Sequence, residues 1–166
     1  FLIIGTTFDA IAQDGGITQR RTDCGRGRTY QSGYEVFNES ELIAMCNNIG
    51  EQAVELLYAE ECPTEKTSLV LAPDQMILQI HESIGHPLEV DRILGDERNY
   101  AGWSFVRLED FGKLKYGSDI MNISFDPTIE NELASYGFDD SGKKAEKEFI
   151  IKNGVLLRGL GGTESE

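Results

Sequence analysis

The sequence PDQMILQIHESIGHP, residues 73–87, contains both histidines of the chain, His81 and His86. A glutamate, Glu82, directly follows the first of them. Neutral imidazole is a good ligand for zinc, and a carboxylate beside a metal site can accept a proton from an attacking water. The pattern HExxxH therefore favours a metal site at these three residues.

The spacing of the two histidines constrains how such a site can form. On a regular α-helix, five residues turn through about 500°, which leaves the two imidazoles roughly 140° apart. In one solution, His81 and Glu82 lie on the last full turn of a helix and His86 lies on its exit. Pro87 disfavours helical torsions at the residue before it, and Gly85 suits a left-handed helix end. In the other solution, a wide turn of π type brings the two rings together.

Structural roles for the two histidines are the alternative, with His81 as a core histidine and His86 as a capping one. Glu89 and Asp91 follow closely in the sequence. Either carboxylate could orient a histidine by accepting a hydrogen bond from its second ring nitrogen. Solvated charges on a surface helix would explain the same two residues equally well.

The residues before the motif predict two helices. Apolar side chains recur every three or four residues over Glu39–Glu60, which predicts a long helix with one buried face. Pro73 is well suited to the first position of a second helix, which would extend to about Gly85. Between the helices, Glu61–Lys66 breaks the apolar pattern and marks a boundary between two structural units. Thr67–Ala72 is short and apolar and predicts a strand.

Strands are predicted toward both ends of the chain. Phe1–Phe8 is rich in β-branched and aromatic residues. Asp14–Gly16 is a turn signal, so Ile17–Asp23 would return antiparallel to this first strand. Asn153-Gly154 is the strongest hairpin signal of the chain and would join two strands within residues 148–160. The predicted fold class is α+β, with antiparallel sheets, a long helix and a motif-bearing helix.

Composition narrows the classes of function. The chain has 166 residues and a net charge of −14, which argues against direct binding to nucleic acid because phosphate contacts need clustered Lys and Arg. Cys24, Cys46 and Cys62 are odd in number and irregularly spaced, which fits a reducing compartment. No signal peptide and no membrane-spanning apolar run is found. The chain starts at Phe1 without a methionine, which favours a piece of a longer protein.

The motif and the residues that follow it resemble the TldD/PmbA family of zinc proteases. The resemblance rests on His81–His86, on the directly following Pro87–Asp91, and on the hairpin and glycine-rich exit of residues 148–162. It is strong over 67–166 and weaker before. It implies a two-domain protein, in which residues 1–62 end an N-terminal α/β domain and residues 67–166 begin a mostly β C-terminal domain.

The resemblance also implies roles for the motif. By matching position, His81 and His86 would be zinc ligands, and Glu82 would be the catalytic base in the hydrolysis of peptides or unfolded segments. The family's third ligand is a cysteine far downstream, and this chain has no cysteine after Cys62. The zinc site of this piece would therefore be incomplete, with its third ligand outside the chain.

Family members act in the cytoplasm as homodimers, or as heterodimers with a related subunit. We therefore expect a peptide or unfolded protein as substrate, a dimeric partner, and neither nucleic acid nor membrane as a direct partner. Two other functions stay open. One is a non-catalytic interaction fragment of a dimeric assembly, and the other is a structural zinc site, which would need four protein ligands.

Overall fold

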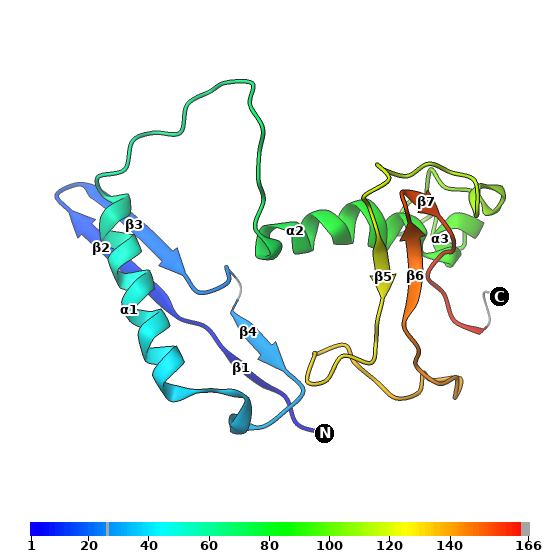
Figure 1. Ribbon diagram of the computed structural model, residues 1–166, viewed down its shortest axis with the longest axis horizontal. Coiled ribbons are helices and arrows are strands. Elements are labelled where there is room, and N and C mark those ends of the chain that lie inside the picture. The colour runs from blue at the N-terminus through cyan, green and yellow to red at the C-terminus, as the bar shows by residue number, and fades with distance from the viewer. Residues whose placement is uncertain (26, 164–166) are drawn as a thin grey trace. The chain divides into compact units, whose positions relative to one another are not determined.

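The computed structural model describes residues 1–25 and 27–163, which fold into two compact units. The first unit consists of residues 1–74 with Asn131–Leu133. The second contains Gln75–Glu130 and, of the described residues, 134–163. Figure 1 shows helices and antiparallel strands in both units, as the predicted α+β class requires.

The first unit contains two strand pairs and one long helix. Strands β1 (Ile4–Thr6) and β4 (Arg28–Tyr30) pair antiparallel, and so do β2 (Asp9–Asp14) and β3 (Ile17–Thr22). The predicted turn at residues 14–16 is confirmed. The predicted partner of Ile17–Thr22 is wrong, because β3 pairs with the strand directly before the turn and β1 pairs with β4 instead.

Helix α1 (Glu39–Leu56) packs against β2 and β3. Asn38 caps its first turn, since its side-chain oxygen accepts hydrogen bonds from the Ser40 and Glu41 amides. Ile49 and Ala53, on the predicted apolar face, are buried. The helix ends before the predicted Glu60. Its last turn has no basic residue, and the acidic residues that follow are unfavourable at the negative end of a helix dipole.

Residues 59–72 form neither helix nor strand, so the predicted strand at Thr67–Ala72 is wrong. Leu69 is 78% exposed and Val70 is 95% exposed. A short apolar segment becomes a strand only when a neighbouring strand pairs with it, and none does so among the described residues. A short 3-10 helix spans Tyr34–Val36 in the first unit.

The motif-bearing helix leads into the second unit, which begins at Gln75 within it. Helix α2 (Pro73–Ile80) starts at the predicted proline and continues into a π turn, His81–Gly85. A 3-10 helix, His86–Leu88, and helix α3 (Val90–Leu94) follow. A further 3-10 helix spans Leu108–Asp110.

A three-stranded antiparallel sheet completes this unit, in the order β5 (Ile123–Phe125), β6 (Glu148–Lys152) and β7 (Val155–Leu156). The hairpin predicted at Asn153-Gly154 is confirmed, and both turn residues have positive φ, 49° and 74°. Seven residues form the buried core of the unit: Ile84, Leu88, Ile93, Val106, Ile150, Ile151 and Leu156. Ile84 of the π turn therefore shares one core with Ile150, Ile151 and Leu156 of the sheet.

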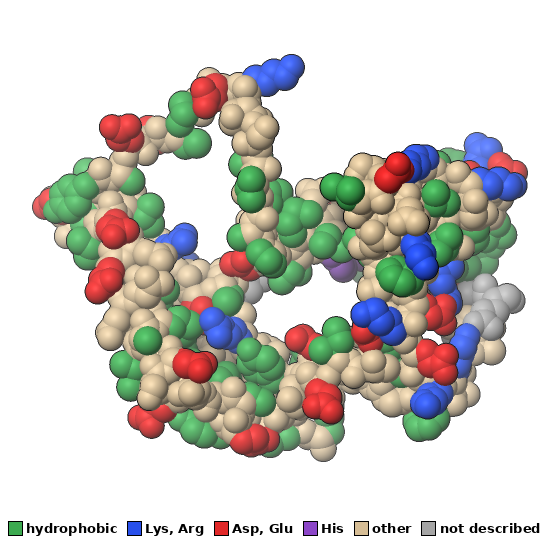
Figure 2. All heavy atoms as spheres, viewed as in Figure 1, with side chains coloured by type: hydrophobic (Ala, Val, Ile, Leu, Met, Phe, Trp, Pro, Cys, Tyr) green, Lys and Arg blue, Asp and Glu red, His purple; other side chains and the backbone are tan. Residues whose placement is uncertain are grey.

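Surface charge is distributed over both units. In Figure 2 the acidic side chains are scattered over the visible face of each unit, with Lys and Arg interspersed among them. None of the helices in residues 1–25 and 27–163 has the length and apolar character to cross a bilayer.

Candidate metal centre

The two histidines meet because the chain forms a π turn between them. The backbone N–H of His86 donates to the carbonyl of His81, five residues earlier, where a regular helix would use the residue four earlier. The ring centroids then lie 4.1 Å apart with an angle of 70° between the ring planes. Of the two solutions open from the sequence, the π turn is the one that forms.

The other solution, a helix exit at Gly85, is wrong. Gly85 has φ −54° and ψ −70°, which are right-handed helical torsions. His86 is helical as well, with φ −59° and ψ −45°, although Pro87 follows it. Proline disfavours helical torsions at the preceding residue without forbidding them. Here the π-turn hydrogen bond and the 3-10 helix that continues through Pro87 hold His86 in that conformation.

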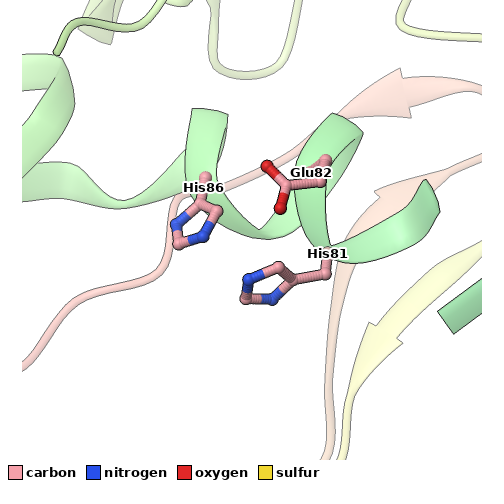
Figure 3. Close-up of side chains that lie close together, drawn as sticks. All are labelled: His81, Glu82 and His86. Atoms are coloured by element: carbon pink, nitrogen blue, oxygen red, sulfur yellow. The ribbon is translucent and has the colours of Figure 1, made fainter. Parts of the chain in front are cut away.

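Glu82 completes a cluster of three donors. One ligand atom each of His81, Glu82 and His86 can be chosen so that all lie within 4.8 Å of one another. Figure 3 shows the two imidazoles and the carboxylate gathered on the same side of the π turn. Within the described part of the chain, no other group of three or more His, Cys, Asp or Glu residues is close enough to hold one ion. His81 is exposed, which excludes the core-histidine alternative in this chain.

Glu89 orients the ring of His86. Its Oε1 lies 2.8 Å from Nδ1 of His86. A carboxylate can only accept, so Nδ1 carries the ring proton and Nε2 keeps the lone pair that a metal needs. Of the two acidic residues expected to orient a histidine, Glu89 makes this contact. Among the described residues, no hydrogen bond joins a protein group to a ring nitrogen of His81, so the two rings are held differently.

The segment that carries Glu89 is fixed by the glycine-rich C-terminal stretch. The Leu160 amide donates to the Leu88 carbonyl at 2.7 Å, and the Val90 amide donates to the Leu160 carbonyl at 2.8 Å. Glu89 and Leu160 thereby form a parallel bridge. The sequence predicts Leu160 in the hairpin strand, but β7 ends at Leu156 and Leu160 pairs beside the motif instead.

A tyrosine from a distant segment contacts the π turn. The Tyr116 hydroxyl donates to the carbonyl of Ser83 at 2.6 Å. Gln79 donates to the Ser83 hydroxyl at 2.6 Å, so both polar groups of Ser83 have partners. Burial raises the pKa of the Tyr116 phenol above its ordinary value, which keeps the donating proton in place. Tyr116 lies 33 residues after Ser83, and no local pattern in the sequence predicts this contact.

The donor set fits zinc. Two imidazoles are common ligands of a catalytic zinc, and such a site keeps an open position beside a nearby carboxylate. The three cysteines of the chain, Cys24, Cys46 and Cys62, are free thiols, and none belongs to the cluster. The chain therefore offers two imidazole ligands and one carboxylate.

Comparison with known proteins identifies the family. The profile described as the PmbA/TldA metallopeptidase C-terminal domain matches residues 64–165, which is more than half of the chain. The chain belongs to the TldD/PmbA metallopeptidase family. The matched range includes the complete motif and the C-terminal stretch that pairs beside it.

Relatives of this TldD/PmbA chain include a metalloprotease of Methanothermobacter thermautotrophicus, 32% identical over 160 residues. That alignment covers 95% of this chain and 32% of the relative. A zinc metalloprotease TldD homolog of Saccharolobus solfataricus is 26% identical over 149 residues, covering 88% of this chain and 30% of the relative. The chain thus spans about a third of the length of these relatives.

A solved structure has the same fold. The crystal structure of a candidate modulator of a DNA gyrase from Thermotoga maritima matches with a TM-score of 0.65 at 19% identity. The match covers 96% of this chain and 33% of that one. At this level of identity, the likeness supports the TldD/PmbA fold alone.

Proposed function

We propose that this chain supplies the HExxxH part of a zinc-dependent peptidase that hydrolyses peptide bonds in peptides or unfolded segments. The observation that carries the proposal is the convergence of His81, Glu82 and His86 at the π turn. Membership in a metallopeptidase family and the zinc metalloprotease among its relatives support it further.

Each residue of the cluster has a proposed role. His81 and His86 would hold the zinc through neutral ring nitrogens, and Glu89 keeps His86 in the tautomer that can do so. When bound, zinc acts as a Lewis acid that polarises the scissile carbonyl and acidifies water. Glu82 accepts the proton of the attacking water and delivers it to the leaving amine, which is general base and then general acid catalysis.

The third ligand is proposed to lie outside this chain. Catalytic zinc sites usually have three protein ligands, and the chain offers two imidazoles. The family resemblance implies a cysteine downstream of the motif, and none follows Cys62 here. Residues 1–62 and 67–166 would then be parts of an N-terminal and a C-terminal domain of the whole protein.

The substrate and the partner are proposed from the family and the sheet. Among the described residues β5 pairs with β6 alone, so its other edge could receive an extended peptide by backbone pairing, with low side-chain selectivity. The whole protein would act in the cytoplasm as a homodimer or as a heterodimer with a related subunit. The net charge of −14 supports a protein substrate over nucleic acid.

Zinc content tests the ligand assignment. The full-length protein is expected to bind about one zinc per motif, and His81→Ala or His86→Ala should reduce the bound zinc strongly because each removes one of few ligands. Metal analysis by mass spectrometry after desalting gives the measurement. An unchanged zinc content in both variants would place the metal elsewhere. An isolated 166-residue chain is expected to bind zinc weakly, since a ligand is missing.

Activity separates the base from the ligands. Glu82→Gln keeps the shape of the side chain but removes the proton acceptor, so zinc content should stay at the wild-type level. Turnover of an unfolded peptide by the full-length protein should fall at least ~10²-fold, the usual scale for lost acid–base catalysis. Loss of zinc together with activity would make Glu82 a ligand. Full activity in this variant would move the base to another residue.

The alternative is a non-catalytic interaction fragment with an incomplete metal site. The observation in its favour is that the chain contains only two imidazoles and that no cysteine follows them in the sequence. A full-length protein that dimerises in sedimentation, but binds no zinc and cleaves no unfolded peptide, would establish this alternative over the peptidase.

A further inference from the structure

The Arg92 side chain, which comes from α3, contacts three groups close to His86. Its Nε donates to Oε2 of Glu89 at 3.1 Å, and its Nη1 donates to the Ala101 carbonyl at 2.8 Å. The side chain of Glu97 lies 3.9 Å from Nη2. The Arg92 side chain is 15% exposed, while that of Glu89 is 36% exposed. The guanidinium is therefore the anchored partner, and it limits the positions that the Glu89 carboxylate can take.

Glu89 and Arg92 compete for one atom of His86. Oε1 of Glu89 lies 2.8 Å from Nδ1, and Nη2 of Arg92 lies 3.4 Å from the same nitrogen. A carboxylate requires Nδ1 to carry a proton, whereas a guanidinium, which only donates, requires Nδ1 to be bare. The two partners thus favour opposite tautomers. The shorter contact belongs to Glu89, which leaves Nε2 bare and able to bind a metal.

We infer that Arg92 is a positioning residue for the metal site. By engaging Oε2 of Glu89, it directs Oε1 onto His86 and fixes the tautomer that binds zinc. This inference rests on the proposed function, because it requires His86 to be a zinc ligand. Arg92 positions only His86 in this way, since no hydrogen bond from a protein group reaches the ring of His81 among the described residues.

The planar fork of arginine suits this task. Its separate N–H groups reach Glu89 and the Ala101 carbonyl at the same time, at 3.1 and 2.8 Å. A lysine ammonium is a point charge without a fixed fork, so it would not hold both partners in one geometry. The contact with the Ala101 carbonyl fixes the guanidinium to the backbone. The contact with Glu89 then fixes the carboxylate, which orients the ring of His86.

The test is a double-mutant cycle in the full-length protein, with Arg92→Met, Glu89→Ala and both together. Glu89 is the residue directly before α3 and its side chain makes no capping hydrogen bond, so its replacement removes no cap from the helix. Arg98→Met is the matched control, because Arg98 lies over the Trp103 ring, with its guanidinium carbon 5.0 Å from the ring centroid. The readouts are the zinc Kd, from competition with a chelating dye, and the unfolding temperature of the metal-free protein.

The expected pattern is non-additive. Arg92→Met alone should weaken zinc binding about 10-fold or more, on the scale of lost contacts behind a metal ligand. In the Glu89→Ala background the same change should not weaken binding and should restore part of it, because Arg92 then stabilises the wrong tautomer of His86. Equal weakening in both backgrounds, or no difference from Arg98→Met, would overturn the inference.

Two controls keep the result interpretable. If Arg92→Met lowers the unfolding temperature of the metal-free protein, Arg92→Lys takes its place in the cycle, since it keeps a donor for Ala101 but lacks the fork. The same non-additivity must then appear. A wild-type protein that binds no zinc would refute the proposed function instead, so the two failures are distinguishable.

Discussion

Tyr116 and Ser83 show how one side chain can support an unusual turn. A π turn interrupts the regular helical hydrogen-bond ladder, and polar groups at such a point need other partners. The Tyr116 hydroxyl donates to the Ser83 carbonyl at 2.6 Å, in the middle of the turn that joins His81 to His86. The conformation that brings His81 and His86 together therefore depends on a residue outside the candidate metal site.

Replacing Tyr116 by Phe should destabilise the turn. The loss of one hydrogen bond should lower the free energy of unfolding by about 1 kcal/mol, and zinc binding should weaken because the two ligands lose their alignment. Thermal unfolding and zinc titration of the full-length protein measure the two effects. Tyr100→Phe is the matched control, since Tyr100 is 97% exposed and should tolerate the change. Equal results for both variants would contradict this role.

The same tyrosine gives a pH dependence. Burial raises the pKa of Tyr116 in the folded protein above its ordinary value of about 10. Its contribution to stability is therefore complete below pH 10 and is lost as the pH rises through the folded-state pKa. Urea unfolding of wild type and Tyr116→Phe between pH 8 and 11 should show the two free energies of unfolding converging at the alkaline end. A constant difference would contradict the assignment.

At the scale of elements, the C-terminal stretch is held tightly beside the motif. Leu160 pairs with the backbone around Glu89, and Gly159 lies against it with no room for a side chain. A Cβ on Gly159 would come within 2.8 Å of Val90 Cγ2 and 2.9 Å of the Leu88 carbonyl oxygen. Only glycine lets these two segments approach so closely.

Gly159→Ala should therefore separate the two segments. We expect a free energy of unfolding lower by ~1–3 kcal/mol, the usual cost of overpacking, and weaker zinc binding because Glu89 moves with its segment. Denaturant unfolding and zinc titration are the measurements. Gly137→Ala is the control, because nothing lies within 4 Å of a Cβ at that position and its φ is not positive. A Gly159→Ala variant as stable as Gly137→Ala would show that the two segments can move apart at little cost in free energy.

The sequence predicted local features of these elements better than their partners. Pro73, Asn38 and Asn153-Gly154 act on their own neighbours, so the helix starts and the hairpin turn were correct. Pairing depends on residues far away, and so the strand at Thr67–Ala72 and the partner of β3 were wrong.

In the candidate site, too, the residues close together in the sequence were easier to predict than the distant one. His81, Glu82, His86 and Glu89 lie within nine residues and could be identified from side-chain chemistry and spacing. Arg92 lies three residues after Glu89, a spacing at which side chains meet on a helix, but it was not predicted as part of the site. Tyr116 could not be found, since only the fold brings it to Ser83.

At the scale of the whole molecule, the candidate metal site belongs to one of two compact units. The core of the second unit includes Ile84 within the π turn, so order at His81 and His86 is coupled to that core. The first unit has its own packing of α1 on β2 and β3. A ligand that binds only the folded state stabilises it by mass action, and the effect should be largest where the ligand binds.

Zinc should therefore protect the second unit selectively. In the full-length protein, zinc at 100 times its Kd should stabilise the site by about 2.7 kcal/mol. Hydrogen exchange followed by mass spectrometry should slow at residues 81–93 on adding zinc, with little change in α1. His86→Ala should abolish the difference. Equal protection of α1 and the motif would show that the two units unfold together.

The π turn also couples the spacing of the two histidines to the register of the residues that follow them. Deleting Ile84 would leave the histidines four residues apart, as on one face of an ordinary helix. The deletion would also rotate every later residue by about 100° and draw the chain back by one helical step of about 1.5 Å. Glu89 would then lose its register with Leu160. Such a shortened motif should bring both imidazoles onto one face yet bind zinc more weakly, which titration of the deletion variant can measure. The five-residue spacing of the histidines is thus coupled to the pairing of Glu89 with Leu160. Evolution could shorten the motif only by changing the motif and the paired C-terminal stretch together.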